Sequence, residues 1–517
     1  MISTILALGD ACQAVMTWEI LSVVVLGTII GHVFGLLPGL SGMVAVSILI
    51  PITYDMSFVT ALAFLISILG AGTFGGSITA ILIAIPGTST SVMTVIDGYP
   101  LAKQGRALYA IVLAGVASAL GSLFSIVIFI VLLPLFNKMF FLFGAPEKFL
   151  FILLGLVTVA FSVKGQVING LLGGVIGILV SLIGFSSVAG GLRFTMDIDQ
   201  LWDGVASIPF FVGTFAVAEF IDISTKAAGL KKIAAKPGDI VEIDSREPAL
   251  KQVRQGTLDV LKHWFLFARS SVIGFIIGFI PGIGGSAAQM ITYTHAVQSA
   301  KDKSKFGHGD IRGIIAPESA NNAKDVGQLL PTFGLGIPGS VEMSILLGAF
   351  MIHGIQPGTN LFDTHLSTVW VVIVCLAIAN ILSSAIGITL GAKLVRWLQM
   401  PPVIYMSVVI GFALLGAYVT KYQFSDIVIA VIFGFIGYAM KIFGINRVTF
   451  VVAFILGEML ELYFWQSATV SRGNYSIFFV NSAATVVIWL LLLSSVIIYF
   501  RPELQAWFKK NERGART

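Results

Sequence analysis

The chain has 517 residues, of which 57% are hydrophobic and only 11% are charged, and its mean hydropathy is +0.96. A soluble globular protein carries roughly 25% charged residues, so this composition excludes that class and indicates an integral membrane protein. The net charge of +5 does not indicate nucleic-acid binding, because the Lys and Arg residues lie at the ends of apolar runs and in loops, as the positive-inside bias favours.

The apolar runs are long enough to cross a bilayer core, and they are too long and unbroken for barrel strands. The sequence therefore predicts an all-α, polytopic membrane protein with roughly 12 transmembrane helices plus broken or re-entrant helices. The first run, from Trp18 to Thr53, lacks a basic n-region and a small-residue cleavage site, so we expect a retained helix. Further runs follow at 107–134, 149–163, 167–185, 205–223, 264–280, 369–390, 404–419, 427–440, 448–465 and 477–499.

Basic residues give the expected orientation. No Lys or Arg precedes Lys103 and Arg106, which places the N-terminus outside the cytoplasm. The longest polar stretch, Ser224 to Lys262, reads as a cytoplasmic linker, and the basic tail places the C-terminus in the cytoplasm.

Two Pro-Gly motifs occur twice. "GLLPGLSG" (Gly35 to Gly42) returns 243 residues later as "GFIPGIGG", and "AIPGTSTS" (Ala84 to Ser91) returns 252 residues later as "GIPGSVEM". Basic residues lie on opposite sides of the motifs in the two halves, which predicts two inverted-topology repeats of the kind found in secondary transporters. We expect a first repeat at 1–223, a linker at 224–262, a second repeat at 263–475, and an extra helix with a cytoplasmic tail at 476–517.

Pro and Gly interrupt these apolar runs, and a broken helix at membrane depth survives only where protein or a water-filled cavity satisfies its backbone. Each new helix start presents free N–H groups, so four starts together predict an anion site that needs no fixed cation. The alternative interpretation is simple kinking or close packing, but four motifs in paired order favour the cavity. The substrate-binding candidates are Gly39, Leu40, Ser41, Gly42, Pro86, Gly87, Thr88, Ser89, Thr90, Ser91, Gly282, Gly284, Gly285, Ser286, Pro338, Gly339 and Ser340.

The segment from Ala316 to Gly339 is unusually polar. Asn321, Asn322 and Asp325 lie at helical spacing, and the two asparagines complete the list of substrate-binding candidates. Asp325 and Glu318 are candidates for a coupling Na⁺ or H⁺. For the neighbouring Lys324, a functional role and a place on an interfacial helix both stay open. We expect no other metal and no cofactor.

Three more polar residues have simpler expected roles. His32, three residues before the first motif, could sense protons, although a plain hydrogen bond to a neighbour is the simpler interpretation. Asp97 in "DGYP" is expected to cap its own turn. Glu342 follows the last Pro-Gly break and brings a negative charge to the helix start there.

Three long motifs resemble one family. "GLLPGLSG", the segment from Gly75 to Ala107 and the segment from Ala316 to Gly358 are similar to the large permease subunit of the tripartite tricarboxylate transporters, the TctA family. The resemblance implies cation-driven uptake of carboxylates across the inner membrane of a prokaryote. It also implies a small membrane subunit and a periplasmic solute-binding protein as partners, and it points to the same Pro-Gly stretches and asparagines as the site.

The function predicted is therefore secondary active import of a carboxylate, such as citrate or a related organic acid, by alternating access. An anion channel or passive pore built on the same broken helices is the alternative. An enzyme is not expected, because no nucleophile, base and electrophile set is apparent. The identity of the acid, the choice of Na⁺ or H⁺, and a homo-oligomeric state stay open.

Overall fold

The computed structural model describes residues 2–37, 41–140, 143–161, 167–186, 188, 190–229, 248–280, 285–355, 358, 361–362, 365–397 and 402–494. Four predicted site residues, Gly39, Leu40, Gly282 and Gly284, lie outside this range. Residues 230–247 of the expected linker and the tail from 495 to 517 lie outside it as well.

The all-α, polytopic fold class is confirmed. Among the described residues, seven helical runs are long and apolar enough to cross a membrane, and a bent pair of helices raises the number to eight. Five shorter apolar helices of 10–17 residues accompany them. Several apolar runs of the sequence are thus divided into shorter helices, as interruption by Pro and Gly predicts.

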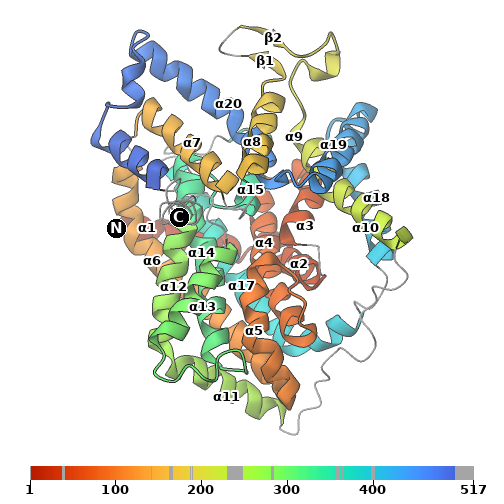
Figure 1. Cartoon of the computed structure of the whole chain (residues 1–517), viewed down its shortest axis with the longest axis vertical. Helices are drawn as coiled ribbons and strands as arrows, with labels where there is room; N and C mark the ends of the chain where they lie inside the picture. The colour runs from red at the N-terminus through yellow and green to blue at the C-terminus, as the bar shows by residue number, and fades with distance from the viewer. Residues whose placement is uncertain are drawn as a thin grey trace, which may run out of the picture. The chain divides into compact units, whose positions relative to one another are not determined.

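The chain divides into two compact units, Met1–Lys138 with Ala206–Met440 and Met139–Val205 with Lys441–Thr517. The candidate site lies entirely in the first. The helices that begin in the first unit are α1 (Ile2–Val15), α2 (Trp18–Leu36), α3 (Gly42–Leu49), α4 (Phe58–Ile83), α5 (Val92–Leu101), α6 (Ala107–Phe140), α9 (Ser207–Phe211), α10 (Ala218–Gly229), α11 (Ala249–Lys262), α12 (Trp264–Phe279), α13 (Gly285–Ser299), α14 (Arg312–Leu335), α15 (Val341–Ile352), α17 (Leu366–Trp397), α18 (Pro402–Lys421) and α19 (Phe424–Ile442) (Figure 1).

The described residues of the second unit form three long helices and a short hairpin. The helices are α7 (Ala145–Phe161), α8 (Val167–Ser181) and α20 (Arg447–Val470), and a shorter helix follows at Ala483–Ser494. Strands β1 (Gly184–Ser186) and β2 (Gly191–Arg193) pair antiparallel, with Phe185 opposite Leu192. Arg193 on β2 forms an ion pair with Glu461 on α20, with 2.7 Å between Nη1 and Oε1, and this contact fastens the hairpin to the helix.

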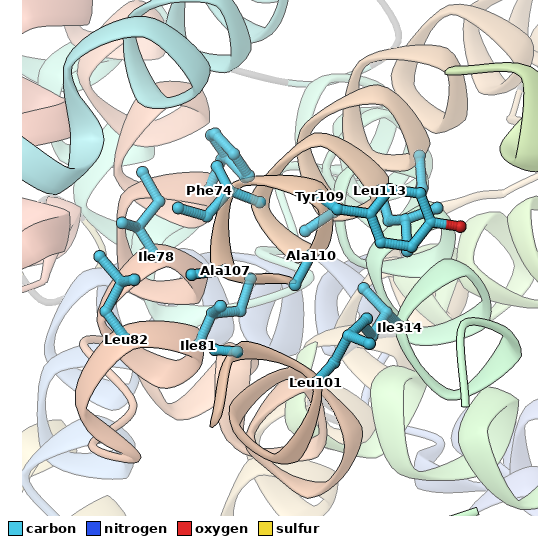
Figure 2. Close-up of a cluster of buried hydrophobic side chains, with 14 of the residues drawn as sticks. Phe74, Ile78, Ile81, Leu82, Leu101, Ala107, Tyr109, Ala110, Leu113 and Ile314 are labelled. Atoms are coloured by element: carbon cyan, nitrogen blue, oxygen red, sulfur yellow. The ribbon is translucent and has the colours of Figure 1, made fainter. Parts of the chain in front are cut away.

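A buried apolar cluster joins elements from both halves of the sequence in the first unit (Figure 2). Phe74, Ile78 and Ile81 of α4 pack with α5, with the start of α6 and with Ile314 of α14. Val260 of α11 belongs to the same cluster. Tyr109 of α6 also donates its hydroxyl hydrogen to the Asp259 carboxylate of α11 over 2.6 Å. Both contacts show that the expected linker ends in a helix that packs on the helices of the first unit.

Glycines allow the same close helix packing in both halves. A Cβ on Gly31 or Gly35 of α2 would overlap a carbonyl oxygen of α4, and a Cβ on Gly274 or Gly278 of α12 would overlap one of α14. The glycines of the two helices are 243 positions apart. The carbonyls that they face are Ile68 and Gly72 on α4, and Ala320 and Lys324 on α14, which are 252 positions apart. The two offsets are those of the sequence motifs, so the motifs belong to a packing unit that occurs twice.

Candidate functional site

The first pair of motifs divides helices as expected. Helix α2 ends at Leu36 and α3 begins at Gly42, while α12 ends at Phe279 and α13 begins at Gly285. Ser41 is the N-cap residue of α3, but its side chain makes no capping hydrogen bond. Gly42 lies against α4, where a Cβ added to Gly72 would be 3.1 Å from the Gly42 Cα. Among the described residues, the hydroxyl of Ser41 therefore satisfies none of the N–H groups at the start of α3.

The second pair of motifs ends α4 and α14 in the same way. Ala84 and Gly336, 252 positions apart, both have left-handed backbone conformations, with φ of 56° and 70°. Glycine adopts this conformation readily and alanine does so rarely, so Ala84 is held there by its surroundings. Pro86 and Pro338 follow at equivalent positions and prevent the helices from continuing.

The helix starts after these prolines are capped by hydroxyls. Thr88 and Ser91 form a capping box around the short helix η2 (Ser89–Ser91), with 3.3 Å between Thr88 N and Ser91 Oγ. Ser340 accepts a hydrogen bond from the backbone N–H of Met343 over 3.4 Å. Thr90, Ser91 and Ser340 are all buried. Capping satisfies part of each helix start and leaves other N–H groups directed at the space before it.

The glycines inside these motifs bring the breaks close to the helices of the same half. Gly87 donates its N–H to the Gly76 carbonyl over 3.2 Å. A Cβ added to Gly339 would lie 2.9 Å from the Gly278 carbonyl oxygen and would also meet the Gln328 side chain. These two Pro-Gly turns thus lie against the C-terminal part of a long helix, α4 in the first half and α14 in the second.

Helix starts from the two halves meet each other. Ser286 of α13 donates its hydroxyl hydrogen to the Ser89 carbonyl over 3.0 Å. A Cβ on Gly285 would collide with both the Thr90 methyl group and the Lys324 side chain. The candidates from "AIPGTSTS" and "GFIPGIGG" are therefore brought together, with Lys324 beside them.

Of the two interpretations of Lys324, the structure excludes a place on an interfacial helix surface, because this side chain is buried inside the protein. Its ammonium group pairs with the Asp325 carboxylate, and the two side chains are 5% and 9% exposed. Asp325 also accepts hydrogen bonds from Gln328 Nε2 over 2.9 Å and from Thr73 Oγ1 over 3.3 Å. The site thus contains a fixed cation that the helix-start argument did not require, and Thr73 joins it from α4.

Asn321 and Asn322 are fully buried, and neither amide has a hydrogen-bond partner within the described part of the chain. Four polar atoms, Nδ2 and Oδ1 of each residue, are therefore unsatisfied. A buried polar group without a partner is destabilising by about 1–3 kcal/mol. Groups of this kind are typical of ligand sites, because the ligand supplies the missing donors and acceptors.

Glu318 lies one helical turn before Asn322 and is enclosed by hydroxyls. Its carboxylate accepts hydrogen bonds from Ser77 of α4 over 2.7 Å, from Ser118 of α6 over 2.9 Å, and from Thr94 of α5. No ion-pair partner of Glu318 occurs among the residues that the structure describes. An unpaired buried carboxyl surrounded by oxygen atoms can hold a proton or a hard cation.

The three hydroxyls around Glu318 carry no recognisable signal in the sequence. Isolated Ser and Thr residues in apolar helices commonly bond to their own helix, as Ser67 does with the Ala63 carbonyl over 2.6 Å. Only the tertiary packing of α4, α5 and α6 around α14 selects Ser77, Thr94 and Ser118.

The expectation for Asp97 is wrong. Its carboxylate does not cap its own turn, because it accepts hydrogen bonds from the N–H groups of Gly307, Gly309 and Asp310 over 2.8, 3.0 and 2.9 Å. The Tyr293 hydroxyl is a fourth donor, over 2.9 Å. Asp97 therefore ties α5 of the first half to the loop between α13 and α14 of the second half.

His32 follows the simpler of its two interpretations. Its Nδ1 lies 2.9 Å from the hydroxyl of Ser383 on α17, and the side chain is fully buried. Among the described residues, no group of three or more His, Cys, Asp and Glu side chains is arranged to hold a metal ion.

Comparisons with known proteins found related sequences. The family model described as "Tripartite tricarboxylate transporter TctA family" matches residues 21–452. An Agrobacterium vitis protein named "Uncharacterized 52.8 kDa protein in TAR-I ttuC' 3'region" is 30% identical over 484 residues, which cover 93% of each chain. A second protein from that organism, "Uncharacterized protein in TAR-II ttuC' 3'region", is 29% identical over 45% of this chain and 96% of its own length. No solved structure matches the chain.

Proposed function

Because this chain belongs to the TctA family of tripartite tricarboxylate transporters, we propose that it is the permease that imports a carboxylate anion, driven by a cation gradient. The observation that carries the proposal is the convergence of the helix breaks on α4 and α14. There the start of α13 lies against the buried Lys324, and on the same helix as this lysine two buried asparagines have amides without hydrogen-bond partners among the described residues.

The substrate carboxylate would receive hydrogen bonds from three kinds of donor. These are the backbone N–H groups at the starts of η2 and α13, the hydroxyl of Thr90, and the Nδ2 groups of Asn321 and Asn322. Lys324 supplies positive charge, which is strong in a buried site because little water screens it. Such a site selects an anion by charge and by donor geometry.

The coupling cation would bind next to the anion. Asp325 is paired with Lys324, which also belongs to the proposed substrate site. Glu318 lies on the same side of α14 as Asn322. Both carboxylates are therefore candidates to bind Na⁺ or H⁺. The asparagine Oδ1 atoms can accept from a proton donor or coordinate Na⁺ while Nδ2 binds the carboxylate. One pair of amides can therefore link cargo and cation, which is what coupling requires.

The wider setting follows from the family and the basic residues. We propose that the protein lies in the inner membrane of a prokaryote with its N-terminus outside and its C-terminus in the cytoplasm, and that it works by alternating access between two inverted repeats, 1–223 and 263–475. A small membrane subunit and a periplasmic solute-binding protein are its proposed partners. The chain is proposed to transport without catalysing a reaction.

The test is uptake of labelled carboxylates into proteoliposomes, with Na⁺ and H⁺ gradients imposed separately. We expect accumulation against the substrate gradient under one of them. Flux that only follows the substrate gradient would instead indicate a channel. Asn322→Ala should abolish accumulation while the variant is expressed at the wild-type level. Asn169→Ala on α8 is a control outside the proposed site and should transport like the wild type.

A further inference from the structure

A second polar feature lies away from the transport site, at the corner between α11 and α12. The two helices meet at His263 with a bend of 72°. A cleft of about 260 Å³ opens there, lined by the end of α11, the start of α12, the end of α13 and Arg312 of α14. Three cationic side chains line it, Lys262, Arg269 and Arg312, and no acidic side chain among the described residues does. The cleft is therefore electropositive.

Two of the three cations are available to a ligand. Arg312 is held by Asp310, with 2.6 Å between Nη2 and Oδ2. Lys262 lies 3.3 Å from Asp259, but its side chain is 70% exposed, and exposed pairs of this kind contribute little.

Arg269 has no carboxylate partner among the described residues. It donates to the Ser299 hydroxyl and lies 5.4 Å from the centre of the Phe265 ring. Its Nε is buried without a hydrogen-bond partner in the described part of the chain. A guanidinium group in this state is suited to a phosphate, because its planar fork can donate two parallel hydrogen bonds.

The surface beside the cleft has the composition of a membrane interface. Helix α11 buries Gln252, Gly256 and Val260 and exposes leucines between basic residues on its other side. The exposed leucines are Leu250, Leu258 and Leu261. Next to the cleft, Trp264 and Phe265 are 64% and 63% exposed. An amphipathic helix of this type lies in the headgroup region, with its apolar side chains directed toward the acyl chains.

We propose that this cleft binds the phosphate of an anionic phospholipid, with Lys262 and Arg269 as its ligands and with the acyl chains along Trp264 and Phe265. Basic pockets between transmembrane helices are suited to such headgroups, and the aromatic and leucine side chains at the rim favour a lipid over a free ion. The bound lipid would fix α11, and with it the end of the segment that joins the two halves, to the membrane surface. This site is independent of the carboxylate site.

The test measures lipid binding by the full-length protein. Native mass spectrometry in detergent, with phosphatidylglycerol or phosphatidylcholine added, should show one retained phosphatidylglycerol and no comparable phosphatidylcholine. Arg269→Gln and Lys262→Ala should each weaken retention roughly fivefold, because a basic residue near an anionic surface contributes ~1 kcal/mol. Lys303→Ala, which removes an exposed charge from the neighbouring loop, should have no effect.

Three results would overturn the proposal. The first is equal retention of phosphatidylglycerol and phosphatidylcholine by the wild type, a comparison that needs no variant to fold. The second is undiminished phosphatidylglycerol retention by the double variant of Lys262 and Arg269. The third is displacement of the lipid by inorganic phosphate at low millimolar concentration, which would make the site one for the free anion.

Discussion

The two unpartnered asparagines lead to a prediction about stability as well as transport. Asn322→Leu keeps the branching of the side chain at Cγ but removes both unsatisfied polar atoms from a fully buried position. The desolvation penalty of such a group is about 1–3 kcal/mol, so the substrate-free variant should be more stable than the wild type by an amount of this order. That difference corresponds to roughly a 5- to 160-fold shift in the unfolding equilibrium. Uptake should be lost.

The assay is denaturant unfolding of purified protein in detergent without substrate, run beside proteoliposome uptake. Asn380→Leu is the matched control. Asn380 is equally buried and its Oδ1 also has no partner among the described residues, but its Nδ2 donates a hydrogen bond to the Ser122 hydroxyl over 2.8 Å. Removing that hydrogen bond should offset any gain, so this variant should be no more stable than the wild type. The reasoning is refuted if Asn322→Leu is destabilised as much as Asn380→Leu and still transports.

Three other substitutions test the remaining parts of the site. Glu318→Gln keeps a hydrogen-bonding side chain among the three hydroxyls but removes the titratable carboxyl group. Substrate exchange should therefore persist while gradient-driven accumulation disappears. Accumulation at the wild-type level would remove Glu318 from the proposed coupling site. Gly278→Ala places a methyl group against the Lys324 carbonyl, so thermal unfolding should show a loss of stability of about 1–3 kcal/mol. Gly9→Ala is the control, because no atom lies within 4 Å of its new methyl group and its stability should not change. Lys324→Met leaves the Asp325 carboxylate unpaired and should destabilise by about 3–5 kcal/mol. Adding Asp325→Asn should then restore stability without restoring uptake, and full uptake by the double variant would contradict a role for the pair.

The breaks in the helices could be predicted from the sequence because their cause is local. Pro removes a backbone donor and Gly allows unusual backbone angles, wherever they occur in an apolar run. Their pairing at two fixed offsets also predicted the repeated packing. Ala84 shows the limit of local reasoning, because an alanine does not signal a left-handed conformation. Its surroundings hold it in the conformation that Gly336 adopts at the equivalent position of the second half.

The contacts inside the site could not be predicted, because they depend on which faces of helices meet. Helical spacing placed Asn322 and Asp325 together, but it could not show whether Lys324 faced lipid headgroups or the protein interior. Asp97 was assigned to its own turn because short-range capping is the usual role of such a residue. The four donors that it serves come from a loop and a helix about 200 positions away.

Thr73 and Asp325 occupy equivalent positions in the two halves, and they touch. Gly72 and Lys324, one position earlier, are also equivalent. Here the first half has no side chain and the second half has an ammonium group. The packing unit that occurs twice therefore carries different side chains at equivalent positions. If the proposed site binds an acid with unlike ends, that acid should be held one way round, with its more negative end toward Lys324. The same asymmetry should let the site distinguish the two mirror-image forms of a chiral acid.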